Sequence, residues 1–278
     1  MNNLPHWVIW HIPHANTAIP AEFRDQFLLN DAELQVEAEL VADTAADRLY
    51  LRDGDTAVVF PWSRLVVDPE RLFGDAEPME AHGLGVTYRR THDGRPLRRE
   101  LLSTEEKSLV DLYTDHHARL SNLVEAALEQ HGRCLIIDGH SYPAEPLPFE
   151  DTLLDRPPVC LGTDPIHTPN WLVQAFVEAF NDYRIETGLN TPYSGTLVPK
   201  EFQCDARVMS LMIETRKNCY DGKIREAVEQ ALASAIRHGL IYEGNSLDSG
   251  GPPGRRLSDV PKIWRSGLWR PFSYPVPS

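Results

Sequence analysis

The 278-residue sequence predicts an α/β fold: a three-layer sandwich of helices around a mixed, mostly parallel sheet. Short apolar runs alternate along the chain with longer amphipathic segments that have the periodicity of helices. The content of 42% hydrophobic and 24% charged residues is typical of a soluble globular protein, and the length suffices for one large domain. We therefore expect a single α/β domain over residues 1–244.

The candidate strands are the short apolar runs. They cover residues 7–11, 56–61, 65–67, 133–138, 159–162 and 208–214. The run that ends in "LIIDGHSY" leads directly from apolar residues into Asp138, Gly139, His140 and Ser141. Ligands of α/β sheets bind at the carboxyl ends of strands, so these polar side chains are predicted to reach a site.

Four segments are predicted to be helices from the spacing of their apolar residues. They are 31–50, 103–131, about 170–181 and about 221–238. In the first, Asp31 can cap the start and residues 34, 38, 41, 45 and 49 share one face. In the second, Ser103 and Glu106 form a predicted capping box, and Gly132 ends the helix.

Two segments have the composition of irregular structure. Residues 74–98 are rich in glycine, proline, arginine and histidine, and long loops of this kind are often functional. Residues 245–278 are dense in glycine, proline and serine, and we expect a C-terminal tail. Trp264, Trp269 and Phe272 suggest that part of this tail packs down or meets a partner.

Charge and cysteine usage exclude several classes of partner. The formal net charge of -14 argues against nucleic-acid binding, which needs a basic face. No signal peptide and no apolar run of about 18 residues is present, so no membrane partner is expected. The four cysteines are widely spaced, without a zinc pattern, and indicate reduced thiols in a cytoplasmic protein: Cys134, Cys160, Cys204 and Cys219.

Polar residues at strand ends supply the components of a zinc hydrolase. Two histidines and a carboxylate can hold Zn²⁺ and leave a position for water, while a further glutamate serves as general base. The sequence has no HExxH motif, so spacing alone does not identify such a site. The candidates at strand ends are His11 and His14, Ser63, Arg64, Asp68 and Arg71, Asp138 and His140, and Glu214 and Arg216.

Four motifs taken together resemble the N-formylglutamate amidohydrolase family. They are "IPHA", "WSRLVVDPER", "IIDGHS" and "LMIETR…CY", which occur in the family's order between about residues 8 and 220. The resemblance implies a zinc-dependent hydrolase whose fold is related to the zinc carboxypeptidases and aspartoacylases. It also implies cleavage of the amide bond between a small acyl group, such as formyl, and an amino acid.

The resemblance implies three metal ligands and one base. His14, Asp43 and His140 match likely Zn²⁺ ligands, and Asp47 is the rival of Asp43 in the same helical segment. Glu214 matches the general base of the late strand. Asp138 is expected to orient a histidine, and Ser141 stands beside His140 as a further supporting residue.

The resemblance also implies substrate contacts. Arg64 and Arg71 match arginines that clamp the substrate carboxylate, for which a bidentate guanidinium is well suited. Tyr193 and Ser194 lie in a segment that resembles the family's substrate loop. Two positions depart from the family pattern, because Asn16 replaces a glycine and Glu70 replaces an amide that could help to hold an anionic substrate.

Two alternatives remain open at the level of sequence. One is a carboxypeptidase or amidase that acts on peptides, with the 74–98 loop shaping a wider cleft. The other is a non-catalytic binding protein on the same fold, which the joint presence of His14, His140 and Glu214 disfavours. His116 and His117 are expected on the surface of the long helix and outside the metal set. The acyl group, the amino acid and the oligomeric state stay open.

Overall fold

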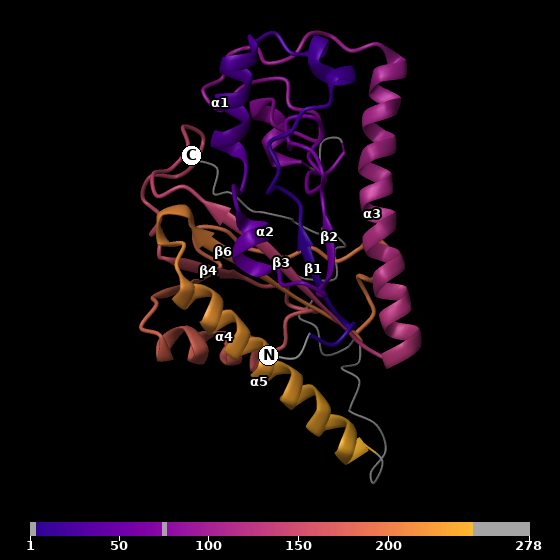
Figure 1. The fold of residues 1–278 in the computed structure, drawn as a ribbon, viewed down its shortest axis with the longest axis vertical. Coiled ribbons are helices and arrows are strands. Elements are labelled where there is room, and N and C mark those ends of the chain that lie inside the picture. Colours follow the sequence, from indigo (N-terminus) through magenta and orange to yellow (C-terminus); the bar gives the residue numbers. More distant parts are fainter. Residues whose placement is uncertain (1–3, 74–76, 247–278) are drawn as a thin grey trace, which may run out of the picture.

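The computed structural model of the protein describes residues 4–73 and 77–246 (Figure 1). The predicted tail, with Trp264, Trp269 and Phe272, lies outside the described residues apart from its first two positions. Within the described ranges, no helix is both long and apolar enough to cross a bilayer.

A mixed, mostly parallel sheet of six strands forms the centre of the molecule, as predicted. Its spatial order is β2-β1-β3-β6-β4-β5, and all neighbouring strands are parallel except β4 and β6. The two longest strands, β3 and β6, lie side by side in the middle. The bounds are β1 Val8–Ile12, β2 Thr56–Val59, β3 Cys134–Tyr142, β4 Val159–Gly162, β5 Thr187–Leu189 and β6 Val208–Arg216.

Helices cover both faces of this sheet (Figure 1). The long helix α3 lies on one side, and α4 and α5 lie on the other, with α2 beside α5. The α-helices are α1 Asp31–Val41, α2 Ala46–Tyr50, α3 Ser103–His131, α4 Asn170–Asp182 and α5 Gly222–Ser246. Short 3-10 helices cover Ala21–Gln26, Pro78–His82, Lys200–Phe202 and Lys217–Cys219.

Two hydrophobic clusters stabilise the arrangement. The larger joins the sheet to the helices on both of its faces, and residues such as Val8, Ile9 and Ile136 are completely buried in it. The second cluster joins α1 and the segment 60–97 to the N-terminal part of α3, through Leu34, Leu65 and Leu109 among others. The second cluster fixes the loops that close the site over the end of the sheet.

The predicted helix 31–50 is wrong as a single element, because it is broken at Asp43. α1 ends at Val41 and α2 begins at Ala46. The backbone N–H of Asp43 donates to the carbonyl of His14 at 2.8 Å instead of continuing the helix, and Ala45 adopts a left-handed φ of 69°. The start is capped by Asn30 with Glu33, and not by Asp31.

Other boundaries also differ from expectation. Residues 65–67 form no strand; they are buried in a turn closed by the Val66 N–H and the Ser63 carbonyl. β3 and β6 continue beyond their apolar runs, so Asp138 and His140 lie within a strand and not after it. Helix α3 begins after Leu102, whose N–H donates to Glu105 in place of the predicted Ser103–Glu106 box, and Gly132 ends it as predicted.

Candidate active site

The strand register places four candidate side chains on one face of the sheet. His140 of β3 is paired with Glu214 of β6, and Asp138 of β3 is paired with His11 of β1. Residues two apart on a strand point the same way, so all four share the face that α3 covers. The same alternation sends the neighbouring side chain of Ser141 to the opposite face, although Ser141 is buried at the pocket wall.

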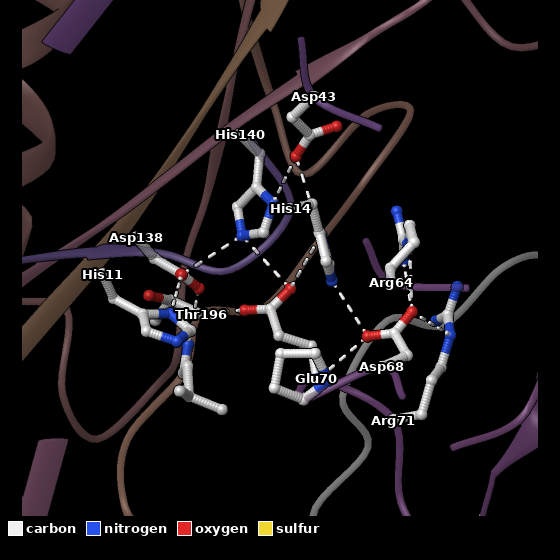
Figure 2. Close-up of polar contacts among 12 residues, drawn as sticks. His11, His14, Asp43, Arg64, Asp68, Glu70, Arg71, Asp138, His140 and Thr196 are labelled. Carbon is white, nitrogen blue, oxygen red and sulfur yellow. Dashed lines mark hydrogen bonds and ion pairs between the residues drawn. The ribbon is translucent and has the colours of Figure 1, made fainter. Parts of the chain in front are cut away.

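His14 and Asp43 complete a cluster with His140 (Figure 2). One potential ligand atom from each of the three side chains lies within 4.8 Å of the other two. The Oδ2 atom of Asp43 is 3.0 Å from Nδ1 of His140 and 3.6 Å from Nδ1 of His14. All three are buried, with exposed fractions of 2 to 4%. Asp47 lies in α2, is only half-buried, and does not join the cluster.

Asp68 holds the other nitrogen of the His14 ring. Nε2 of His14 is 2.9 Å from Oδ1 of Asp68, while Oδ2 of Asp68 accepts from Arg64 at 2.7 and 2.9 Å and from Tyr88 at 3.0 Å. Burial acts to raise the pKa of Asp68, but Arg64 and His14 together hold it well below its usual range. An ionised Asp68 accepts a hydrogen bond from the Nε2–H group of His14. The lone pair of the ring then lies on Nδ1, which faces Asp43.

Asp138 holds His140 in an equivalent way. Nε2 of His140 is 3.1 Å from Oδ1 of Asp138, so Nδ1 of His140 faces Asp43. Oδ1 of Asp138 also contacts Nδ1 of His11 at 2.7 Å, and Oδ2 accepts from the Leu197 N–H at 2.9 Å. The Nδ1 atoms of His14 and His140 are thus both directed at the Asp43 carboxylate. Asp68 fixes the orientation of the first ring, and Asp138 fixes that of the second.

His116 extends this network and corrects the expectation that it lies on the helix surface. It is 2% exposed, and its Nε2 is 2.8 Å from Nε2 of His11. Burial, followed by the charges of His11 and His117, lowers the pKa of His116 to about 2. His116 lies one turn before the buried Leu120, on the apolar face of α3, so the spacing along the helix did carry a signal of its burial. His117 instead contacts the Pro69 carbonyl at 2.7 Å.

Glu70 lies at the centre of the site. The sequence identified this residue only as a departure from the family motif. Its carboxylate stands between the His14–His140 pair and the His11–Asp138 pair (Figure 2). Oε2 is 3.2 Å from Nε2 of His140 and 3.7 Å from Nδ1 of His14. The side chain is 3% exposed, yet neither oxygen has a hydrogen-bond partner among the described residues.

The buried carboxylates shift the pKa values of their neighbours. Burial acts to lower the pKa of His140, but Glu70 and Asp138 raise it well above its usual range. Burial raises the pKa of Glu214, and Asp43 and Glu70 add to this effect, while His140 opposes it. The two pKa shifts have one cause. The cluster of carboxylates stabilises the positively charged form of His140 and destabilises a further negative charge on Glu214.

A pocket opens above the cluster, and most predicted substrate residues line it. His14, Asp43, His140 and Glu214 contribute to its floor, and Arg64, Arg71, Tyr193 and Ser141 to its walls. Tyr193 donates to Glu150 and accepts from Arg156. Ser194 is not among the described residues that line the pocket. Lys217, which the sequence reasoning missed, lines it and donates to the Leu40 carbonyl at 3.2 Å.

Glycine at position 139 is needed for the close packing behind His140. A Cβ atom placed there would lie 2.6 Å from Cδ1 of Ile12 and 2.9 Å from Cδ2 of Tyr50. Tyr50 packs on this backbone because its hydroxyl donates to the His140 carbonyl at 3.0 Å and contacts the Thr215 hydroxyl at 2.7 Å. The absence of a side chain therefore lets α2 hold β3 and β6 in register at the site.

Comparison with known proteins agrees with this architecture. No curated protein matches the chain. The crystal structure of N-formylglutamate amidohydrolase from Ralstonia eutropha superposes with a TM-score of 0.67 at 20% identity, over 87% of this chain and 95% of that one. A gene product of Agrobacterium tumefaciens superposes with a TM-score of 0.52 at 17% identity, over 88% of this chain and 94% of that one. These likenesses show the shared fold.

The sequence itself carries the assignment to a family. The family model described as N-formylglutamate amidohydrolase matches residues 7–221, which include every strand of the sheet and all four side chains on the floor of the pocket. The chain therefore belongs to the N-formylglutamate amidohydrolase family, whose members are amidohydrolases acting on linear, non-peptide C–N bonds.

Proposed function

We propose that the protein is a zinc-dependent hydrolase that removes a small acyl group of the formyl type from the nitrogen of an amino acid. The observation that carries this proposal is the convergence of His14, Asp43 and His140 within 4.8 Å, at the floor of a pocket, with Glu214 paired to His140 across two strands. Family membership supplies the reaction class, and the site supplies the residues.

The donor set fits a divalent zinc ion. Two imidazole nitrogens and a carboxylate oxygen form a common ligand set for catalytic zinc, and both rings are already oriented by acids. Both oxygens of Glu70 and Oε2 of Glu214, which are buried without a hydrogen bond among the described residues, also fit, because buried carboxylates need compensating positive charge. When bound at such a site, Zn²⁺ lowers the pKa of water to about 7 and acts as a Lewis acid on the scissile carbonyl.

Glu214 is the proposed base. It accepts a proton from the attacking water as the water oxygen bonds to the acyl carbon. As the C–N bond breaks, Glu214 returns that proton to the leaving nitrogen, so that the products are a carboxylic acid and a free amino acid. The raised pKa of Glu214 supports this role, because a carboxylate that binds a proton more readily than usual is a better proton acceptor.

Cationic side chains around the pocket are the proposed contacts of the amino acid's carboxylate. Arg71 lines the pocket and lies 3.6 Å from Asp68 and 3.9 Å from Glu77. Arg64 already donates to Asp68 and to the Val41 carbonyl, so its contacts support His14 as well as any substrate. Lys217 adds a third positive charge at the wall. Small N-acyl amino acids suit this charged pocket.

The test combines metal analysis with substrate turnover. The purified protein is expected to hold zinc and to release the acyl acid from N-formyl amino acids. Glu214→Gln is expected to lose about 10²- to 10⁴-fold in kcat while it retains zinc, because only the proton acceptor is changed. Glu186→Gln, in an exposed residue next to β5 outside the pocket lining, serves as the control and should keep both properties.

Three results would count against the proposal. One is zinc-independent hydrolysis, and another is full activity of Glu214→Gln. The third is turnover of peptides without turnover of any N-acyl amino acid, which would indicate the peptide-directed alternative.

A further inference from the structure

Beside the proposed zinc ligands lies a second set of donor atoms. One atom from each of His11, Glu70 and Asp138 lies within 4.8 Å of the others, and all three residues are buried. Their exposed fractions are 0, 3 and 0%. They come from β1, from the segment after Asp68, and from β3, so the fold itself brings them together.

Glu70 is the feature that hydrogen bonding within the protein does not explain. Its two oxygens are buried and lack hydrogen-bond partners among the described residues, although they lie near three imidazoles. Oε1 is 3.5 Å from Nδ1 of His11, and Oε2 is 3.2 Å from Nε2 of His140. A buried carboxylate without donors is costly unless a cation neutralises it. Figure 2 shows one oxygen of Glu70 directed to each donor set.

We infer that His11, Glu70 and Asp138 form a second divalent-cation site and that the Glu70 carboxylate bridges it to the site of His14, Asp43 and His140. The protein is thus built to hold two ions per chain. This inference extends the proposed function, but the binding that it describes is measurable without any substrate.

An orienting role for His11 and Asp138 explains less. The 2.7 Å contact between Nδ1 of His11 and Oδ1 of Asp138 is a satisfactory hydrogen bond, and it would help Asp138 to hold His140 without any ion. This interpretation leaves both Glu70 oxygens without a hydrogen bond among the described residues. A divalent cation held by Nδ1 of His11, Asp138 and Glu70 would supply the missing partner of the Glu70 carboxylate. His11 keeps a partner at Nε2 in His116, 2.8 Å away, which fixes the ring for ligation.

The donors define the class of ion. Two carboxylates and one imidazole suit a divalent first-row metal such as Mn²⁺, Co²⁺ or Zn²⁺ better than a soft thiophilic ion. The carboxylates of Glu70 and Asp138 balance the two positive charges of one such ion. Paired metal ions are a recurring arrangement in hydrolytic enzymes, where they clamp the oxygens of the reacting group.

The test measures metal stoichiometry on the whole chain. The protein is stripped with a chelator, reloaded with excess Zn²⁺ or Co²⁺, and desalted before elemental analysis. Two ions per chain are expected in the wild type. One ion is expected in His11→Ala, in the milder His11→Gln, which keeps a hydrogen-bond donor beside Asp138, and in His14→Ala. His92→Gln changes a pocket histidine that contacts Glu37 outside both sets, and it should keep two ions.

The bridge has its own readout. Electron paramagnetic resonance of the Mn²⁺-loaded protein is expected to show an exchange-coupled pair, and Glu70→Gln is expected to lose that coupling and to weaken the second ion at least tenfold. Circular dichroism melts check that each variant is folded.

The outcomes separate this inference from the proposed function. One ion per wild-type chain, retained in folded His11 variants, overturns the second site while hydrolysis of N-formyl amino acids still supports the proposed function. Two ions without any hydrolysis support the second site and overturn the proposed function. Two uncoupled ions that are insensitive to His11 and Glu70 overturn the assigned ligands.

Discussion

Ring orientation decides what the histidines of this site can do. His14 and His140 each direct Nε2 at a buried acid, Asp68 or Asp138, and each directs Nδ1 at Asp43. The motifs contain only part of this pattern, because "IIDGHS" holds both His140 and Asp138, whereas "IPHA" gives His14 without its acid. Asp68 lies 54 residues after His14, in a turn beyond β2, so only the fold reveals that pair.

The choice between Asp43 and Asp47 gives a prediction for a single residue. Asp43→Asn is expected to reduce zinc affinity at least tenfold, since it removes the carboxylate that lies 3.0 Å from Nδ1 of His140 and 3.6 Å from Nδ1 of His14. Asp47→Asn, four residues later in half-buried α2, is expected to bind zinc as the wild type does. Isothermal titration calorimetry on both variants checks this. Loss of affinity in Asp47→Asn alone would assign the ligand to α2.

Tertiary contacts at the level of elements explain why some predictions failed. Ala42 and Ala45 have good helical propensity, but the hydrogen bond from the Asp43 N–H to the His14 carbonyl replaces the helical one. Likewise β3 continues through Asp138 and His140 because cross-strand and side-chain partners satisfy those polar groups. The apolar central parts of these strands were predictable, because a short run of apolar residues can be recognised from its composition alone. His116 was missed because a histidine on a helix usually lies outside the core, although its spacing from Leu120 places it on the buried face of α3.

The free energy of unfolding should depend on pH because of His116 in helix α3. Its pKa is lowered to about 2 in the folded protein, from a usual value near 6.5. Below pH 6.5 the unfolded chain binds a proton that the folded chain does not. The free energy of unfolding therefore falls with falling pH, by at most about 1.4 kcal/mol per pH unit from this group.

Denaturant unfolding at pH 7.5, 6.0 and 5.0 measures this dependence. His116→Gln removes the titrating group, so its stability should decline less steeply over this range than that of the wild type. His131→Gln at the exposed end of the same helix should follow the wild type. Identical slopes for wild type and His116→Gln would contradict the expectation.

The whole molecule is the unit that assembles the site. The floor of the pocket takes residues from the segment after β1, from the break between α1 and α2, from β3 and from β6. The fold class and the main ligand candidates could be predicted from the sequence, because the motifs and their order along the chain can be read without a structure. The central place of Glu70 and the contribution of Lys217 were not, because both depend on which loops close over the sheet.

Metal binding should therefore stabilise the entire fold. Zinc at about 100 times its Kd is expected to raise the free energy of unfolding by about 2.7 kcal/mol, which for a chain of this size corresponds to a Tm increase of about 5 to 10 °C. Chelation should reverse the shift, and His140→Ala should reduce it, because this variant lacks a ligand of the His14–Asp43–His140 site. Thermal melts with and without zinc provide the measurement. An equal shift in His140→Ala would place the stabilising ion elsewhere.

The order of strands in the sheet has a consequence for synthesis of the chain on the ribosome. β6 lies between β3 and β4, yet among the described residues it is the last strand to be made. β4 and β5 pair with each other, but they join the rest of the sheet only after Val208–Arg216 has emerged and paired with β3. His14, Asp43 and His140 are translated before Glu214. A nascent chain thus carries the complete set of proposed ligands while the proposed base is still missing, and a single late strand both closes the sheet and completes the site.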